Sequence, residues 1–223
     1  MNKEYNRMID HTYLKADTNQ TIMNKLIKEA KEFNFKTVCV PSAWVAYCKE
    51  QLQGTEVGIT TVVGFPLGNS ISSVKAFEAA EAIRAGADEI DMVINIGKLK
   101  DKDYDYVLND IKTVKAACGS HILKVIVETA LLSDEEITEV SKIVKKSGAE
   151  FIKTSTGFST RGANLNDIVL MKKVAGDEML IKAAGGISTM QDMIDMFNAG
   201  ATRFGTSRSV SILTNTEAEK GAY

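Results

Sequence analysis

Residues 85–95 read Ala-Gly-Ala-Asp-Glu-Ile-Asp-Met-Val-Ile-Asn. Before them, apolar side chains in residues 74–83 recur at the spacing of an amphipathic helix, with charged residues between them. Gly86 stands where that helix should end, because a left-handed C-cap favours glycine, and an apolar, β-branched run follows from Glu89. The same passage from helix through glycine to strand recurs around Gly148 and Gly200. One structural unit is therefore repeated along the chain.

Apolar runs of this kind occur eight times, and several are continuous, as expected of strands that are buried on both faces. Amphipathic segments separate them, and the segment that starts at Ser133 carries a capping box completed by Glu136. Strict alternation of strands and helices predicts parallel strands joined by right-handed crossovers. The eight runs are residues 8–14, 37–40, 57–65, 89–95, 122–129, 149–154, 179–184 and 202–205.

The chain has 223 residues, and no composition break or Pro/Ser-rich linker divides it. Eight units in this length fit a closed barrel, since such barrels span roughly 200 to 250 residues. An open doubly wound sheet usually has fewer strands and a glycine fingerprint after the first one. The predicted fold class is α/β, a single-domain (β/α)8 TIM barrel over residues 1–223, with a short C-terminal tail at about 214–223. The first and last strands have the weakest signals.

Lys and Arg total 27 and Asp and Glu total 29, so the net charge of −2 provides no general attraction for nucleic acid or an anionic membrane. No run approaches the roughly 20 apolar residues of a membrane span, and the polar N-terminus is unlike a signal peptide. We therefore expect a cytoplasmic protein that acts on small molecules. Three cysteines without CxxC spacing and two histidines predict neither a disulfide framework nor a zinc site.

Ionisable side chains stand out within several of the predicted strands, and the active sites of such barrels lie at the C-terminal ends of the strands. Lys153 and Lys182 are on consecutive strands, where burial and a neighbouring cation lower the pKa of an amine. A neutral lysine amine can condense with an aldehyde or ketone to form a Schiff base. Asp91 could then transfer protons, and Lys124 could be its charge partner. The alternative is that these groups form structural ion pairs.

Glycine-bearing turns follow the last two predicted strands, at residues 184–187 and 204–207. Backbone N–H groups in these two loops form the usual phosphate site of such barrels, and they need no lysine. We therefore predict that the ligand carries a phosphate group. Cys39 and His11 are weaker candidates for a nucleophile and a base. A buried apolar role explains Cys39 better, and a hydrogen-bonding role at a strand end explains His11 better.

These residues lie in motifs that resemble the deoxyribose-phosphate aldolase family over nearly the whole chain. The motifs are Met-Ile-Asp-His-Thr-Tyr-Leu at 8–14, Val-Val-Gly-Phe-Pro-Leu-Gly at 62–68, residues 85–95 quoted above, Lys-Val-Ile-Val-Glu-Thr at 124–129, Phe-Ile-Lys-Thr-Ser-Thr-Gly-Phe at 151–158 and Lys-Ala-Ala-Gly-Gly-Ile at 182–187.

The resemblance implies a lyase that reversibly cleaves 2-deoxy-D-ribose 5-phosphate to D-glyceraldehyde 3-phosphate and acetaldehyde. It implies Lys153 as the Schiff-base nucleophile, Lys182 as the residue that tunes its pKa and assists proton transfer, and Asp91 as the proton donor and acceptor. No cofactor or metal is implied. The phosphate-binding residues would be Gly157, Gly185, Gly186, Gly205 and Ser207, and the substrate pocket would include Asp10, Thr12, Cys39, Lys124 and Thr154.

Other readings stay open beside this one. One alternative is another phosphate-binding barrel, either an aldolase of related mechanism with a different acceptor or an isomerase that uses Asp91 as its base. A catalytically silent barrel could also bind a sugar phosphate as a sensor. The resemblance also allows a homodimer, although no interface is visible in the sequence.

Three positions depart from the family pattern. Arg161 stands in a loop that is usually glycine-rich, Ser188 replaces a residue that is often basic, and Arg208 replaces a small residue. Arg161 or Arg208 could supply the charge that is absent at position 188. The C-terminal Tyr223 matches some family members in which a mobile tail reaches the site.

Overall fold

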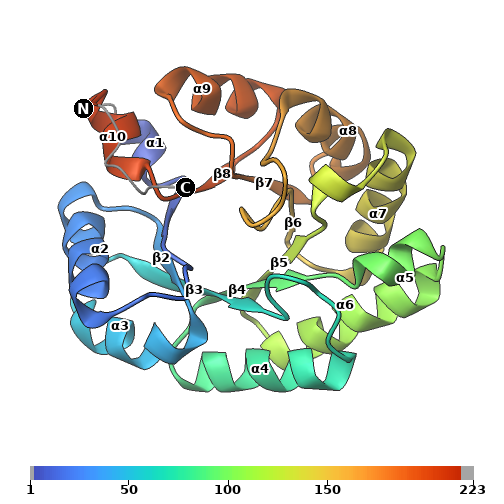
Figure 1. Ribbon diagram of the computed structural model, residues 1–223, viewed down its shortest axis with the longest axis horizontal. Coiled ribbons are helices and arrows are strands. Elements are labelled where there is room, and N and C mark those ends of the chain that lie inside the picture. Colours follow the sequence, from blue (N-terminus) through green and yellow to red (C-terminus); the bar gives the residue numbers. More distant parts are fainter. Residues whose placement is uncertain (1–2, 217–223) are drawn as a thin grey trace.

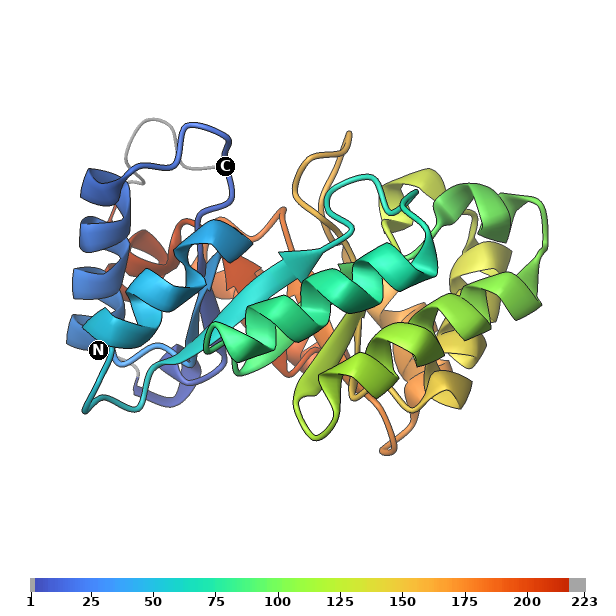
Figure 2. The same cartoon turned by 90° about the horizontal axis from the view of Figure 1, so that it is seen from below.

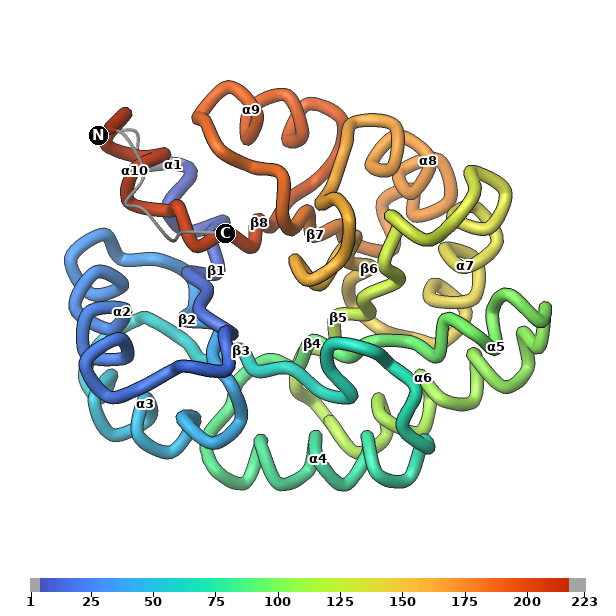
Figure 3. Tube along the Cα trace, viewed as in Figure 1, coloured from blue at the N-terminus to red at the C-terminus, as the bar shows by residue number. Residues whose placement is uncertain are grey.

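Eight short strands pair in parallel and in chain order, and β8 closes on β1. The computed structural model describes residues 3–216, so the proposed tail beyond Thr216, with Tyr223, lies outside the described residues. Figures 1 and 3 show the strands at the centre of a ring of helices. The predicted (β/α)8 barrel is therefore confirmed, including its first and last strands.

The strands are shorter than most of the predicted runs, although no end differs by more than three residues. The apolar sequence continues past the strand ends into the loops, as at Ile94, which is followed by Asn95, the N-cap of the next helix. The strands are β1 Ile9–Thr12, β2 Thr37–Val40, β3 Gly58–Val63, β4 Glu89–Val93, β5 Ile122–Ile126, β6 Phe151–Lys153, β7 Leu180–Ala184 and β8 Arg203–Thr206.

The helices begin and end at the predicted signals. Ser133 and Glu136 form the expected capping box, and Gly148 and Gly200 are C-cap residues with positive φ. The longer helices are α2 Gln20–Phe33, α4 Ser72–Arg84, α6 Tyr104–Cys118, α7 Asp134–Ser147, α8 Leu165–Ala175 and α9 Met190–Ala199. Shorter ones are α1 Lys3–Asn6, η1 Ser42–Trp44, α3 Val45–Gln51, α5 Ile96–Lys100, η2 Thr129–Leu131 and α10 Ser209–Thr214. No helix in the described part of the chain is long and apolar enough to cross a membrane.

Both faces of the barrel strands are buried, but the two faces differ in chemistry. On β4, Ile90 and Met92 belong to the main apolar core, whereas Asp91 between them bonds to lysines of other strands. The same alternation places Ile152 in the core and Lys153 inside the barrel. The hydrophobic effect therefore holds the helices on the barrel, and the interior is left to ionised groups that must pair with one another.

The loops after β1, β3 and β6 rise from the same end of the barrel (Figure 2). Phe65, after β3, and Phe158, after β6, meet there edge to face with their ring centroids 5.3 Å apart. This end carries the C-terminal ends of the strands, so it forms the mouth above the ionised interior.

Candidate active site

Register places the predicted site residues directly beside one another. Lys153 on β6 is opposite Lys182 on β7, and Asp91 on β4 is opposite Lys124 on β5. Side chains at alternate positions point to the same face of a strand, so all four enter the barrel. The sequence-predicted groups from four different strands therefore converge at one place.

Asp91 is the centre of this group. Its Oδ2 lies 2.7 Å from Lys153 Nζ and 2.7 Å from Lys182 Nζ, and its Oδ1 lies 2.8 Å from Lys124 Nζ. Lys182 Nζ also donates to Asp10 Oδ2 at 2.5 Å. Asp91, Lys124 and Lys182 have no exposed surface, and Lys153 is 3% exposed. Lys153 is thus the one of these lysines that reaches toward the mouth.

Electrostatics separates the lysines. Burial lowers the pKa of Lys153, and the charge of Lys182 lowers it further, against the opposing effect of Asp91. Burial would also lower the pKa of Lys182, but the charges of Asp10 and Asp91 outweigh it and raise that pKa. Lys153 is therefore the candidate free amine, and Lys182 stays a cation.

Asp91 stays ionised despite its burial. Burial alone would raise its pKa, but the charges of Lys124, Lys153 and Lys182 hold the pKa of this carboxyl well below its usual range. Such a carboxylate has little affinity for a proton. Any proton transfer through it depends on its lysine partners.

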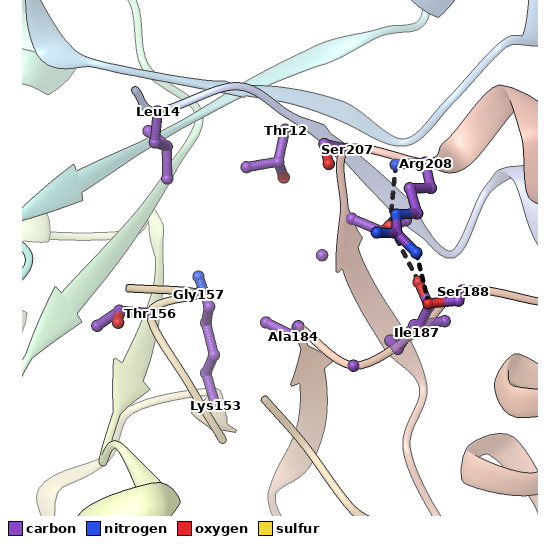
Figure 4. Close-up of a pocket in the computed structure, with 14 residues that line it drawn as sticks. Thr12, Leu14, Lys153, Thr156, Gly157, Ala184, Ile187, Ser188, Ser207 and Arg208 are labelled. Atoms are coloured by element: carbon purple, nitrogen blue, oxygen red, sulfur yellow. Dashed lines mark hydrogen bonds between the residues drawn. The ribbon is translucent and has the colours of Figure 1, made fainter. Parts of the chain in front are cut away.

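A cavity of about 170 Å³ opens above Lys153 at the barrel mouth. Figure 4 shows Lys153 reaching toward this space, with Ser188 and Arg208 on the other side. No carboxylate from the described part of the chain lines it. The lining residues are Thr12, Leu14, Lys153, Thr156, Gly157, Ala184, Gly185, Gly186, Ile187, Ser188, Gly205, Thr206, Ser207 and Arg208.

The residues predicted to hold phosphate all line this cavity: Gly157, Gly185, Gly186, Gly205 and Ser207. Of the residues predicted for the substrate pocket, Thr12 lines it as well. Asp10 and Lys124 lie in the ion-pair cluster, Thr154 bonds to the backbone of Ala184, and Cys39 packs with Leu14 and Val62. Burial raises the pKa of the Cys39 thiol, which disfavours a nucleophilic role for it.

Glycine is required where the loops after β6 and β7 touch. A Cβ on Gly162 would lie 2.2 Å from the carbonyl carbon of Gly185, and Gly186 has a φ of 71°. The two backbones can approach only because these side chains are absent. This contact sets the shape of one wall of the cavity.

The two arginines that depart from the family pattern have different environments. Both terminal nitrogens of Arg161 bond to Asp167, at 2.6 and 3.1 Å, so this residue braces its own loop. Arg208 lines the cavity, and its Nη1 donates to Ser188 Oγ at 2.8 Å. Its Nε is buried and has no hydrogen-bond partner within residues 3–216. Only Arg208 is placed to replace the missing charge at position 188.

The residues that support the cluster from below were not predicted from the sequence. Glu89 Oε2 lies 2.6 Å from Lys124 Nζ, and Arg203 binds Glu89 and Asp10. Side chains two positions apart on a strand point to the same face, so Glu89, two residues before Asp91, was predictable as a second interior residue. Arg203 was predictable in the same way, because it is opposite Lys182 on the neighbouring strand. Glu128 was also missed: with a φ of 55°, it accepts hydrogen bonds from the Thr156 backbone N–H and hydroxyl.

Within residues 3–216, no group of three or more His, Cys, Asp or Glu side chains is arranged to hold a metal ion.

Comparisons with known proteins agree with this geometry. Residues 7–211 match the model of the DeoC/LacD family of aldolases. A deoxyribose-phosphate aldolase of Mycoplasmopsis synoviae is 59% identical over 96% of this chain and 98% of its own length. A crystal structure from Coccidioides immitis, described as a candidate deoxyribose-phosphate aldolase, has a TM-score of 0.94 and 40% identity over 96% of this chain and 85% of that one. The tetrameric deoxyribose phosphate aldolase of Aeropyrum pernix has a TM-score of 0.86 and 27% identity, covering 96% and 91%.

Proposed function

Because this chain belongs to the DeoC/LacD family of aldolases, we propose that it reversibly cleaves 2-deoxy-D-ribose 5-phosphate to D-glyceraldehyde 3-phosphate and acetaldehyde through a Schiff base on Lys153. The observation that carries the proposal is the contrast between two adjacent lysines. Lys153 opens into the cavity with a lowered pKa, whereas Lys182 is fully buried with a raised one. A lyase that works through an imine needs this division between an amine and a cation.

In the first step, the neutral amine of Lys153 attacks the C1 aldehyde of the open-chain sugar. Loss of water leaves a protonated imine, which draws electrons from the neighbouring C2–C3 bond. Lys153 shares Asp91 with two other lysines, and that carboxylate also stabilises the positive charge of the imine.

Cleavage then needs a proton to leave the C3 hydroxyl. As it leaves, a carbonyl forms at C3 and the C2–C3 bond breaks. The electron pair of that bond forms a C1=C2 double bond while the π pair of the imine moves to its nitrogen, which yields an enamine. Glyceraldehyde 3-phosphate departs. Protonation of the enamine at C2 and hydrolysis of the imine then release acetaldehyde and restore Lys153.

Lys182 gives its proton to the hydroxyl that leaves as water when the imine forms, so it is neutral at this stage. The C3 proton then passes through a water molecule to Lys182 Nζ, which lies 2.7 Å from Asp91 Oδ2. Asp91 alone is a poor base, because three lysines stabilise its ionised form. This weakness also counts against an isomerase that would use Asp91 as its base. Lys182 supplies the exchangeable proton, and Asp10 holds it from the other side.

The phosphate group is proposed to bind opposite Lys153, at the glycine turns after β7 and β8. Among the described residues the cavity lining contains the cation of Arg208 and no carboxylate, so its field favours an anion. Hydrogen bonds from Arg208 and nearby backbone N–H groups would hold the phosphate at a distance from the reacting bond. That binding energy positions C1 against Lys153.

Replacing Arg208 with glutamine is expected to raise KM for the phosphorylated sugar by about 10- to 100-fold, the usual value of a charge-assisted hydrogen bond. KM for unphosphorylated 2-deoxyribose should stay near that of the wild type. Steady-state kinetics on both sugars checks this, with Arg84→Gln on the outer surface as the matched control. An equal change for both sugars would show that Arg208 does not bind the phosphate.

The direct test is product analysis with 2-deoxyribose 5-phosphate, together with acetaldehyde and borohydride labelling followed by peptide mapping. We expect both products, and a reduced two-carbon adduct on the peptide that contains Lys153. Binding of a sugar phosphate without products or adduct would instead support the silent sensor.

Location and assembly stay predictions. We propose a cytoplasmic enzyme, because a phosphorylated sugar does not cross a membrane unaided. The homodimer allowed by the family resemblance is testable by analytical ultracentrifugation.

A further inference from the structure

The barrel interior below the cavity contains one more cation than carboxylates. These groups form a continuous cluster of ion pairs in which nearly every member is shielded from solvent. Within the described residues, the cations are Lys124, Lys153, Lys182 and Arg203, and the carboxylates are Asp10, Glu89 and Asp91. In such a medium an unbalanced charge is costly, and this cost favours the neutral form of one of the cations.

Arg203 occupies the floor of this cluster. Its Nη1 lies 2.7 Å from Asp10 Oδ1 and 2.9 Å from Glu89 Oε2, and its Nη2 lies 3.2 Å from Glu89 Oε1. The ring of Phe151 covers the guanidinium, 5.4 Å from its central carbon. An arginine does not deprotonate in a protein, so this charge is permanent. The surplus must be relieved at a lysine.

The carboxylates are shared unequally among the lysines. Lys182 contacts both Asp10 and Asp91, and Lys124 contacts both Glu89 and Asp91. Within residues 3–216, Lys153 contacts only Asp91, which the other two lysines also hold. Because Arg203 engages Asp10 and Glu89, these carboxylates cannot fully neutralise Lys182 and Lys124. Asp91 therefore stays divided among three lysines.

We propose that Arg203 is a positioning residue of this aldolase site, which acts through Asp10 and Glu89 to leave Lys153 as the uncharged amine. The inference rests on the proposed function and goes beyond it, because Arg203 does not line the cavity. Its role is to fix which group in the cluster is neutral, rather than to touch the substrate.

The sign of the pH effect follows from the groups that face each side chain. Lys153 is faced by Asp91 from β4, Lys182 from β7 and the protonated Cys39 thiol from β2, and Arg203 is faced by Asp10 from β1 and Glu89 from β4. Removing the Arg203 charge frees Asp10 and Glu89 for Lys182 and Lys124. Asp91 then pairs more fully with Lys153 and raises the pKa of Lys153. The pH below which imine formation fails should therefore be higher than in the wild type.

The test is the rate of borohydride-trapped acetaldehyde adduct on Lys153, measured against pH. For Arg203→Gln we expect the acid limb to move up by about one pH unit, which makes labelling about tenfold slower below the limb. Arg203→Lys keeps a cation and should move the limb back toward the wild-type position. Circular dichroism on each variant verifies the fold.

Glu89→Gln provides the opposite arm and covers the case in which Arg203→Gln does not fold. Losing this carboxylate enlarges the cation surplus, and Lys124 takes a larger share of Asp91, so the limb should move to lower pH. General structural damage would not shift the limb in opposite directions in the two variants. Unchanged limbs in folded variants would overturn the role of Arg203 alone, whereas an unlabelled wild-type Lys153 would overturn the Schiff-base function and this inference with it.

Discussion

Lys153→Ala is expected to show no measurable aldol cleavage, a loss on the order of 10⁴-fold or more, since covalent catalysis has no partial substitute here. Within residues 3–216, no other lysine lines the cavity. Lys182 and Lys124 are fully buried in ion pairs, and neither lines the cavity. Product formation from 2-deoxyribose 5-phosphate and borohydride labelling should both be absent. The matched control is Lys142→Ala, which removes an exposed lysine on α7.

The same variant should remain folded. Lys153 is the lysine of the buried cluster that gives up its charge, so removing it leaves no charge unpaired, and Asp91 keeps Lys124 and Lys182 as partners. Thermal unfolding should therefore occur at or above the wild-type temperature, unlike the usual outcome of breaking a buried pair. Normal turnover by a folded Lys153→Ala protein would rule out the Schiff-base assignment.

The barrel was predictable because its signal is repeated along the chain. Each unit passes from an amphipathic helix through a glycine to an apolar strand, so errors of up to three residues at strand ends do not alter the topology. Lys153, Lys182 and Asp91 were predictable for a related reason. A charge inside an apolar strand is costly, and it therefore marks a position with a special partner or role.

Side-chain direction in the loops was not predictable in the same way. Arg161 and Arg208 both follow strands, and nothing local distinguishes them. Arg161 donates hydrogen bonds to Asp167, six residues later. Arg208 instead donates to Ser188, which lies in the neighbouring loop, and lines the cavity. That outcome depends on which loops the closed barrel brings together. Thr154 was predicted to belong to the substrate pocket. Because it directly follows Lys153, alternation along the strand places its side chain on the opposite face.

Lys182→Met should lower turnover by about 10²- to 10⁴-fold at neutral pH, the range that proton transfer contributes to catalysis. The thioether chain replaces the buried stem without its charge, and Asp10 and Asp91 retain Arg203, Lys124 and Lys153 as partners. The fold should therefore persist, and thermal unfolding of Lys142→Met in parallel provides the matched control. With the cation surplus gone, Lys153 keeps its proton to a higher pH, because the charge of Lys182 no longer lowers its pKa.

Two measurements on Lys182→Met separate the two roles assigned to that residue. If Lys182 only lowers the pKa of Lys153, then raising the pH deprotonates Lys153 and restores both adduct labelling and aldol cleavage. If Lys182 also moves the proton of the C3 hydroxyl, labelling recovers at high pH but cleavage does not, because imine formation needs only the amine of Lys153. We expect the second pattern, because Lys182 Nζ donates hydrogen bonds to both Asp10 and Asp91 and carries an exchangeable proton. Full recovery of both rates would restrict Lys182 to electrostatic tuning, and wild-type labelling at neutral pH would remove that role as well.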